Sequence, residues 1–435
     1  MRHILIEGGQ KLNGRVNVSG SKNSATKVLI ACVLTEGVCI LENVPQIADV
    51  HSTLDILEHL GANVKRLPNN KTIINASNLN KNFIPTELAK LNRTSFMFIG
   101  ALLNRFSQVL VPLPGGCSIG KRSIDYHLAF LQSLGAEIEQ SNAYFLVKSE
   151  KLKGNKIKLP YPSTTTTEHI LISSVLAKGI TIIKNAAKTP ETLELVEVLH
   201  KMGADIESNN DEFTIRGVNE LRGFQHKIMP DRNEAVTLVT ASLVCGGNVT
   251  IENFPLQNHM NSLFVLLDQI GAKYKLENSS IYLSNDINQY KMVSIESGPF
   301  PDFETDWIPL GLILLNNCIG KGFLHEIVFE DRLRFVHQLI KMGANINLSK
   351  KCLANSNCSF GDEYAHTAEV LGPSYLTGGN LTVEELRGGA ALVIAALSAN
   401  GETQIKNSDI LDRGYENLFH KFKMLGADIH TKHGA

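Results

Sequence analysis

Residues 60–64 read Leu60-Gly61-Ala62-Asn63-Val64, and this phrase of an apolar residue, Gly-Ala and a strand-like run returns five more times. The other copies are Leu134-Gly135-Ala136-Glu137-Ile138, Met202-Gly203-Ala204-Asp205-Ile206, Ile270-Gly271-Ala272-Lys273-Tyr274, Met342-Gly343-Ala344-Asn345-Ile346 and Leu425-Gly426-Ala427-Asp428-Ile429. Successive glycines lie about 70 residues apart. The chain is therefore predicted to consist of six copies of one structural unit.

The glycine of each phrase is expected to end a helix in the left-handed conformation, which satisfies the last helical carbonyls. A helical period precedes the phrase, as in Leu193, Val196 and Leu199, and a strand pattern follows it. A further helix and strand precede several copies, as in residues 235–244 and 249–251. Each unit is thus an α/β unit of about two helices and several strands.

The six units are expected to form two domains, because 435 residues exceed the usual size of one core. Residues 22–229 form the first three-unit domain, and residues 1–21 with 230–435 form the second. The first strand, near residues 4–6, is assigned to the C-terminal half, so the chain crosses between the domains twice. Two crossings make a hinge, and a ligand site is expected in the cleft between the domains.

The composition narrows the class of partner. With 42 basic and 43 acidic residues the net charge is −1, so nothing indicates a nucleic-acid surface, and an anionic ligand needs a local cluster of cations. Seven scattered cysteines do not suggest a disulfide framework. The N-terminal residues lead directly into a strand pattern, without the apolar stretch of a secretion signal or a membrane span. A cytoplasmic location is expected, and the oligomeric state is left open.

The glycine-rich stretch from Pro114 to Arg122 is the first candidate for function. It follows a strand pattern and holds Cys117 among three glycines, with Lys121 and Arg122 at its end. Two readings remain from the residues alone: an anion-binding loop with a reactive thiol, or a turn with an inert cysteine. A P-loop is disfavoured because Arg122 stands where Ser or Thr would hold Mg²⁺.

Arginines are distributed unevenly among the six repeats. Thirteen residues before the phrase glycine stand Arg122 in the second unit and Arg413 in the sixth, whereas the fifth has Glu330 there and Arg332 two residues later. The repeat accounts for the scaffold but not for this asymmetry, which favours a site facing an anion. Salt bridges at helix N-termini are the alternative.

A metal site is a weaker hypothesis. Cys352, Cys358, Asp362 and His366 lie in one stretch that lengthens the fifth repeat, but their spacing matches no zinc pattern well. No convincing dinucleotide-binding motif is present.

Taken together, these motifs resemble the enolpyruvyl transferases, in particular the UDP-N-acetylglucosamine 1-carboxyvinyltransferase family. The resemblance runs from about residue 4 to residue 429 and preserves the order of the motifs. The matching stretches are Ser19-Gly20-Ser21-Lys22-Asn23, Pro114 to Arg122, Pro230-Asp231-Arg232, Phe303-Glu304-Thr305-Asp306, Phe329-Glu330-Asp331-Arg332, Glu385-Leu386-Arg387 and Asp412-Arg413-Gly414-Tyr415-Glu416.

The resemblance implies two inside-out α/β barrels of three units each, joined by a double-chain hinge. It implies transfer of the enolpyruvyl group of phosphoenolpyruvate to the 3′-hydroxyl of UDP-N-acetylglucosamine, through a tetrahedral ketal and with release of phosphate. This is the first step of peptidoglycan precursor synthesis, with domain closure by induced fit and inhibition by fosfomycin. Neither a metal nor an organic cofactor is implied.

The resemblance also assigns roles to residues. Lys22, Arg122 and Arg413 surround phosphoenolpyruvate, Asp306 is the base, and Cys117 is the loop thiol that donates a proton or assists product release. The further substrate-binding residues are Asn23, Arg93, Ser163, Thr164, Val328, Glu330, Arg332 and Arg387.

Three positions depart from the commoner family pattern and concern the acceptor. Ser163-Thr164-Thr165-Thr166-Thr167 replaces Ser-Val-Gly-Ala-Thr, Ser123 replaces a proline, and Glu385 replaces an aspartate. Threonine instead of glycine hinders close backbone approach. A paralogue that uses another nucleotide or nucleotide sugar, and a catalytically silent binding protein, therefore remain as alternatives.

Overall fold

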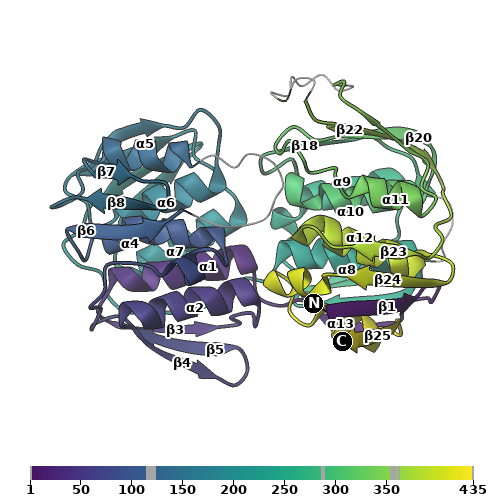
Figure 1. The fold of residues 1–435 in the computed structure, drawn as a ribbon, viewed down its shortest axis with the longest axis horizontal. Coiled ribbons are helices and arrows are strands. Elements are labelled where there is room, and N and C mark those ends of the chain that lie inside the picture. The colour runs from purple at the N-terminus through teal and green to yellow at the C-terminus, as the bar shows by residue number, and fades with distance from the viewer. Residues whose placement is uncertain (1, 114–123, 286–289, 353–359, 361–362, 434–435) are drawn as a thin grey trace. The chain divides into compact units, whose positions relative to one another are not determined.

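The computed structural model describes residues 2–113, 124–285, 290–352, 360 and 363–433. The described chain divides into two compact units, residues 20–113 with 124–229 and residues 2–19 with 230–433 (Figure 1). The chain passes from one unit to the other at Ser19–Gly20 and at Met229–Pro230. They are called here the middle unit and the terminal unit.

The middle unit holds three of the six repeats. Its described helices are α1 (Lys22–Ala31), η1 (Cys32–Leu34), α2 (Ala48–Leu60), α3 (Thr86–Ala89), η2 (Arg93–Met97), α4 (Phe98–Leu102), α5 (Asp125–Ser133), α6 (Thr164–Ser174) and α7 (Pro190–Met202). Its described strands are β3 (Val38–Glu42), β4 (Asn63–Leu67), β5 (Lys71–Asn75), β6 (Gln108–Pro112), β7 (Glu137–Gln140), β8 (Tyr144–Lys148), β9 (Lys156–Lys158), β10 (Ile180–Lys184), β11 (Asp205–Asn209), β12 (Glu212–Arg216) and β13 (Gln225–Lys227).

The terminal unit holds the other three repeats. Its described helices are α8 (Arg232–Cys245), η3 (Gln257–His259), α9 (Asn261–Ile270), η4 (Thr305–Trp307), α10 (Ile308–Asn316), α11 (Val336–Lys341), α12 (Leu386–Ser398), η5 (Ser408–Arg413) and α13 (Leu418–Met424). Its described strands are β1 (Arg2–Glu7), β2 (Gly14–Asn17), β14 (Gly247–Glu252), β15 (Tyr274–Glu277), β16 (Ser280–Asn285), β17 (Tyr290–Lys291), β18 (Ile295–Gly298), β19 (Phe303–Glu304), β20 (Cys318–His325), β21 (Ile346–Ser349), β22 (Thr367–Gly372), β23 (Asn380–Thr382), β24 (Glu402–Lys406) and β25 (Asp428–His433).

The sheets follow the repeats. In the middle unit the strand orders are β13-β3-β5-β4, β6-β8-β7 and β11-β12-β10-β9. In the terminal unit they are β15-β16-β14-β2, β19-β18-β20-β22-β21 with β17 beside β20, and β23-β24-β1-β25. Strand β1 pairs antiparallel with both β24 and β25, so the first strand lies in one sheet with the last two strands.

The centre of each unit is helical. In the terminal unit α8, α10 and α12 pack against one another, and the side chains of all three are buried on every face. In the middle unit most of α6 and most of α1 are buried in the same way, each apart from its first two residues. A helix that is buried all round belongs in a core, so the sheets form the outside of each unit. This arrangement confirms the predicted inside-out α/β fold.

The glycines of the repeated phrase end helices as predicted. Their φ angles are +104° at Gly61, +90° at Gly135, +100° at Gly203, +80° at Gly271, +105° at Gly343 and +95° at Gly426. These values lie in the left-handed region, where a residue with a Cβ is strained. The phrase therefore marks the same helix-to-strand corner in all six repeats.

A second repeated corner uses asparagine. Asn43, Asn185 and Asn253 have φ angles of +57°, +56° and +52°, directly after strands β3, β10 and β14. Each side-chain amide donates to a carbonyl beyond the neighbouring parallel strand, those of Ile228, Leu159 and Val18, at 2.8, 2.9 and 2.8 Å. Asparagine tolerates the left-handed region, and its amide satisfies a carbonyl that would otherwise lack a donor.

Within the described ranges, none of the helices combines the length and the apolar character that crossing a bilayer requires.

Candidate active site

The candidate residues gather where the central helices begin. Lys22 opens α1, Arg93 opens η2 ahead of α4, and Thr164 opens α6 in the middle unit. In the terminal unit Asp306 lies in η4 ahead of α10, and Arg387 is in the first turn of α12. A helix N-terminus favours negative charge, so such positions suit an anionic substrate.

Asp306 connects two arginine side chains in the terminal unit. Its Oδ1 accepts a hydrogen bond from Nη2 of Arg332 at 2.9 Å, and its Oδ2 accepts one from Nε of Arg387 at 3.1 Å. The side chains of Arg332 and Arg387 are only 1% and 3% exposed, whereas that of Asp306 is 27% exposed. Buried guanidinium groups need such a counter-charge. The carboxylate is therefore held by two arginines while one face stays open to solvent.

A second carboxylate orders the loop that carries Val328 and Glu330. The backbone N–H groups of Val328 and Phe329 donate to Oε1 of Glu326 at 2.6 and 2.9 Å. Oε2 of the same side chain accepts from the hydroxyl of Thr305 at 2.8 Å. Burial raises the pKa of Glu326, and the charge of Arg332 opposes that rise. Glu326 thus ties this loop to the residue before Asp306.

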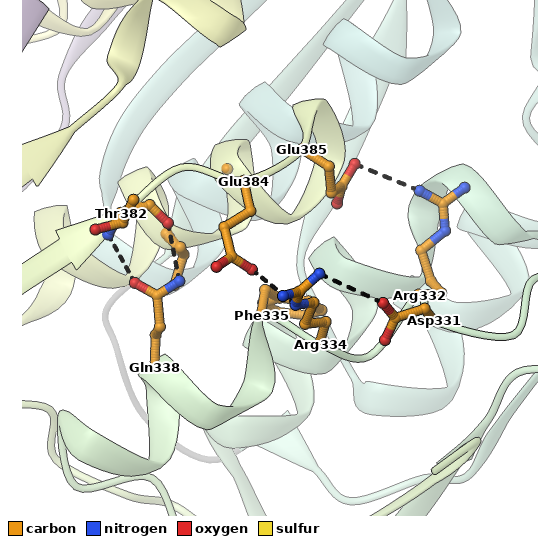
Figure 2. Close-up of a pocket in the computed structure, with 10 residues that line it drawn as sticks. Asp331, Arg332, Arg334, Phe335, Gln338, Thr382, Glu384 and Glu385 are labelled. Atoms are coloured by element: carbon orange, nitrogen blue, oxygen red, sulfur yellow. Dashed lines mark hydrogen bonds and ion pairs between the residues drawn. The ribbon is translucent and has the colours of Figure 1, made fainter. Parts of the chain in front are cut away.

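Glu385 joins Arg332 to the start of α12. Its carboxylate caps the helix by accepting from the N–H groups of Arg387, at 2.8 Å, and Gly388. It also lies 3.6 Å from Nη1 of Arg332. Figure 2 shows this pair at one side of a small pocket. The Glu385 side chain therefore caps α12 and contacts Arg332 at the same time.

The other polar side chains that line this pocket are paired with their neighbours. Arg334 contacts Glu384 through Nε at 3.2 Å and lies 3.8 Å from Asp331, as Figure 2 shows. Gln338 exchanges two hydrogen bonds with the backbone of Thr382, at 2.8 and 2.7 Å. Burial raises the pKa of Asp331. These contacts stabilise the α11 side of the Arg332 network.

Buried contacts fix the start of α8 and one face of Arg387. Arg232 pairs with both carboxylate oxygens of Glu304, and the indole N–H of Trp307 donates to Asn233 at 2.8 Å. The guanidinium carbon of Arg387 lies 5.4 Å from the ring centre of Tyr415. Burial raises the pKa of the Tyr415 hydroxyl. Arg413 ends η5, two residues before Tyr415, and is half-buried.

In the middle unit Lys22 lies against an acid that the sequence did not reveal. Its Nζ is 3.4 Å from Oδ2 of Asp49, a buried residue in the first turn of α2. The side-chain amide of Asn92, next to Arg93, donates to the backbone carbonyl of Asp49 at 3.2 Å. Two of the candidate helix starts therefore meet at Asp49 in α2. Asn23 follows Lys22 directly in α1.

The start of α6 is capped by its own hydroxyl groups. The Ser163 hydroxyl accepts from the N–H of Thr166 at 3.4 Å, and the Thr167 hydroxyl donates to the carbonyl of Ser163 at 2.9 Å. Ser163 and Thr164 are both half-buried. The threonine-rich stretch thus forms a regular capped helix start rather than a glycine loop.

The interior behind these helix starts carries ionisable groups. Glu168 in α6 lies 3.5 Å from Nζ of Lys27 in α1, and burial raises the pKa of Glu168 to about 7. The Nδ1 atoms of His127 and His169 lie 3.0 Å apart. Burial, assisted by the charge of Arg93, lowers the pKa of His127 to about 4. The histidine pair is therefore neutral at physiological pH.

The structure brings together two sets of predicted residues, one in each unit. Asp306, Arg332 and Arg387 form one network, and Lys22 and Arg93 lie beside Asp49 and Asn92. Cys117 and Arg122 lie outside the described residues. Sequence reasoning missed Asp49 and Glu326, and an acid near a helix start or strand end is the signal that could have found them.

Comparison with known proteins identifies the family. Residues 6–422 match the family model described as EPSP synthase (3-phosphoshikimate 1-carboxyvinyltransferase). The chain belongs to the EPSP synthase family. A protein of Carboxydothermus hydrogenoformans named UDP-N-acetylglucosamine 1-carboxyvinyltransferase 1 is 37% identical over 435 residues, 100% of this chain and 99% of its own length. A Wolbachia pipientis protein from Culex pipiens, named UDP-N-acetylglucosamine 1-carboxyvinyltransferase, is 37% identical over 99% of both chains.

Solved structures share the fold of this family member. The enolpyruvyl transferase NikO of Streptomyces tendae has a TM-score of 0.88 at 22% identity and covers 99% of both chains. EPSP synthase of Acinetobacter baumannii has a TM-score of 0.76 at 17% identity and covers both chains fully. At these identities the likeness concerns the fold alone.

Proposed function

We propose that this protein transfers the enolpyruvyl group of phosphoenolpyruvate to the 3′-hydroxyl of UDP-N-acetylglucosamine and releases phosphate. Support comes from family membership and from full-length relatives that carry this activity in their names. The observation that carries the proposal is the Asp306 carboxylate, held at 2.9 and 3.1 Å by two buried arginines and still partly exposed.

The proposed reaction is an addition followed by an elimination. The acceptor oxygen bonds to C2 of phosphoenolpyruvate while Asp306 accepts the hydroxyl proton, and C3 gains a proton to become a methyl group. The resulting tetrahedral ketal then loses phosphate from C2 and a proton from C3. The double bond is restored in the product, so no redox partner is needed.

The cations are assigned to the charge of phosphoenolpyruvate, which carries a phosphate and a carboxylate. Lys22, Arg122 and Arg413 are proposed to bind these groups, and Arg332 and Arg387 to hold Asp306 and the surrounding charge. Arginine binds both kinds of anion through paired hydrogen bonds. The near-complete burial of Arg332 and Arg387 suits a positioning role beside the carboxylate.

The remaining predicted residues are assigned to the UDP-sugar. They are Asn23, Arg93, Ser163, Thr164, Val328 and Glu330. The capped start of α6 offers hydroxyl groups and a helix N-terminus to a nucleotide phosphate or base. Because threonine replaces the glycine usual in this stretch, an enolpyruvyl transferase with another nucleotide-sugar acceptor is the second candidate function.

Cys117 is proposed to be the reactive thiol that covers phosphoenolpyruvate. The neighbouring Lys121 and Arg122 favour a thiolate. Fosfomycin, an epoxide, is expected to alkylate this sulfur and to inactivate the protein when UDP-N-acetylglucosamine is present. Peptide mass spectrometry should find the adduct on Cys117 and on none of the six other cysteines. An unmodified Cys117 in a fully inactivated sample would contradict this assignment.

With this activity the protein is expected in the cytoplasm, where the synthesis of peptidoglycan precursors begins. Closure of the protein around its substrates belongs to the same proposal, because a dry site protects the ketal from water.

Phosphate release with a panel of acceptors tests the function. Phosphoenolpyruvate is supplied with UDP-N-acetylglucosamine, UDP-glucose, UDP-N-acetylgalactosamine or shikimate 3-phosphate. We expect release with UDP-N-acetylglucosamine and at least about 100-fold slower release with the others, since a buried site rejects an acceptor that leaves its polar groups unpaired. If no phosphate is released with UDP-N-acetylglucosamine but phosphate is released with another nucleotide sugar, the second candidate function replaces the proposal.

A further inference from the structure

Three side chains that can bind a metal lie at one end of the sheet formed by β18, β20, β22 and β21. His325 is the last residue of β20, His366 directly precedes β22, and Cys352 follows β21 by three residues. Strands β20 and β22 pair antiparallel with His325 opposite Thr367, so both histidines come from adjacent strands (Figure 1). One nitrogen or sulfur atom from each side chain lies within 4.8 Å of the other two. Among the described residues this is the only such group of three or more.

One ring nitrogen of His325 lacks a hydrogen-bond partner within the part of the chain that the structure describes. The residue is fully buried, and its Nε2 has no hydrogen-bond partner among the described residues. Its other ring nitrogen, Nδ1, lies 3.0 Å from Oε2 of Glu296. Because a carboxylate only accepts, Nδ1 carries the hydrogen and Nε2 presents a lone pair. A buried lone pair without a donor is costly unless something outside the protein binds it.

His366 is in the same tautomer as His325, with the hydrogen on Nδ1. Its side chain is buried, and its Nδ1 lies 3.0 Å from the backbone carbonyl oxygen of Tyr364, so Nδ1 again donates. Its Nε2 lies 3.4 Å from Sγ of Cys352. Metal-binding histidines commonly donate their second nitrogen to a carboxylate or a backbone carbonyl in this way. Cys352 is exposed, which gives an ion a route from solvent.

We propose that Nε2 of His325, Nε2 of His366 and Sγ of Cys352 bind one zinc ion. Two imidazoles and one thiolate are ligands that zinc prefers, and tetrahedral zinc separates sulfur and nitrogen ligands by about 3.5 Å. On binding, Cys352 loses its proton to solvent and the metal–sulfur bond forms, with no change of oxidation state. The spacing within residues 352–366 matches no zinc pattern because the third ligand comes from another strand.

The proposed ion joins the connection between β21 and β22 to the end of β20. The residue after His325 is Glu326, which holds the backbone of Val328 and Phe329 beside Arg332. In this proposal the ion stabilises a strand end that leads into the candidate active site. The three side chains supply three of the four positions of a tetrahedral zinc ion, and the fourth is left to water or another ligand.

The test uses the full chain, purified without a polyhistidine tag and dialysed against one equivalent of zinc. Elemental analysis should find one zinc per chain, and cobalt in its place should give a thiolate-to-cobalt charge-transfer band. Cys352→Ser should abolish that band and lower zinc affinity, measured against a chromogenic chelator, by at least about tenfold. Glu296→Gln removes no ligand and should lower zinc affinity about 10- to 100-fold. Lys351→Ala and His430→Ala, an exposed neighbour and an exposed histidine, should change neither readout.

Zinc should also raise the midpoint of thermal unfolding of the wild-type chain and not that of Cys352→Ser, which separates specific binding from surface adsorption. Because Cys352 is exposed, its replacement by serine leaves the fold intact even if a histidine variant does not fold. Zinc well below one equivalent, or a cobalt spectrum without a sulfur band in the wild-type chain, overturns the proposal. Equal zinc affinity in the wild-type and Cys352→Ser chains overturns it too.

Discussion

The two units share one repeat but use the starts of their central helices differently. In the terminal unit Asp306, Arg332, Arg387 and Glu385 form a charged network whose central carboxylate reaches solvent. In the middle unit the corresponding interior holds Glu168, whose pKa burial raises to about 7, and the neutral histidine pair. In the terminal unit a partly exposed carboxylate is paired with two buried arginines, and in the middle unit burial opposes the ionisation of Glu168.

The comparison shows that the repeat determines positions and the side chains determine chemistry. The repeats supply helix N-termini, and an anion is favoured at such positions. In the terminal unit one of these positions holds Asp306, a partly exposed carboxylate that is paired with two arginines. Changes in the terminal unit should therefore affect turnover, and changes in the middle unit's interior should affect stability against pH.

The largest effect is expected for Asp306→Asn. Asparagine fills the same volume but cannot accept the acceptor proton, so turnover should fall at least about 1000-fold while UDP-N-acetylglucosamine still binds. Calorimetric titration and phosphate release measure the two quantities separately. Glu304→Gln is the control, because it removes the carboxylate that pairs with the buried Arg232. It shows how much turnover is lost when a buried arginine loses its ion pair. Equal losses of turnover in both variants would remove Asp306 as the base.

Glu168→Gln should change the pH dependence of stability. Because the pKa of Glu168 is raised to about 7, this group stabilises the folded chain below the unfolded pKa near 4.5, and that contribution is lost as pH rises through 7. The wild-type free energy of unfolding, taken relative to the variant, should fall by about 3 kcal/mol between pH 4.5 and 8.

Urea titrations at a series of pH values measure this difference. Glu207→Gln is the control, since Glu207 is exposed and Arg216 lowers its pKa. A wild-type-to-variant difference that does not change with pH would show that Glu168 is ionised in the folded chain and would weaken the contrast between the units.

The smallest effect is expected for the helix-ending glycine that the repeats of both units share. Gly203→Ala in the middle unit and Gly271→Ala in the terminal unit place a Cβ at φ angles of +100° and +80°, with no atom within 4 Å of it. The cost is backbone strain alone, about 1 kcal/mol in each case. Thermal unfolding should show equal losses and unchanged turnover. A loss at one site only would mean that the two corners are not equivalent.

The sequence predicted the fold well because the decisive features are local. A glycine that must adopt positive φ recurs in six phrases, and β1 has an apolar pattern with no partner in the first unit. Three of the candidate residues, Asp306, Arg332 and Arg387, lie in one hydrogen-bonded network in the structure. Residues whose role depends on a distant contact were missed: Asp49 matters only because α2 lies beside Lys22, and His325 only because β20 pairs with β22.

The most direct test compares UDP-N-acetylglucosamine with an analogue that lacks the 3′-hydroxyl of the sugar ring. Phosphate release and mass spectrometry of the nucleotide sugar are followed in the same reaction with phosphoenolpyruvate. The account predicts phosphate and an equal amount of enolpyruvyl sugar from the natural acceptor, and neither from the deoxy analogue at comparable occupancy. Phosphate released equally with both acceptors would contradict addition of the 3′-hydroxyl and with it the proposed transfer.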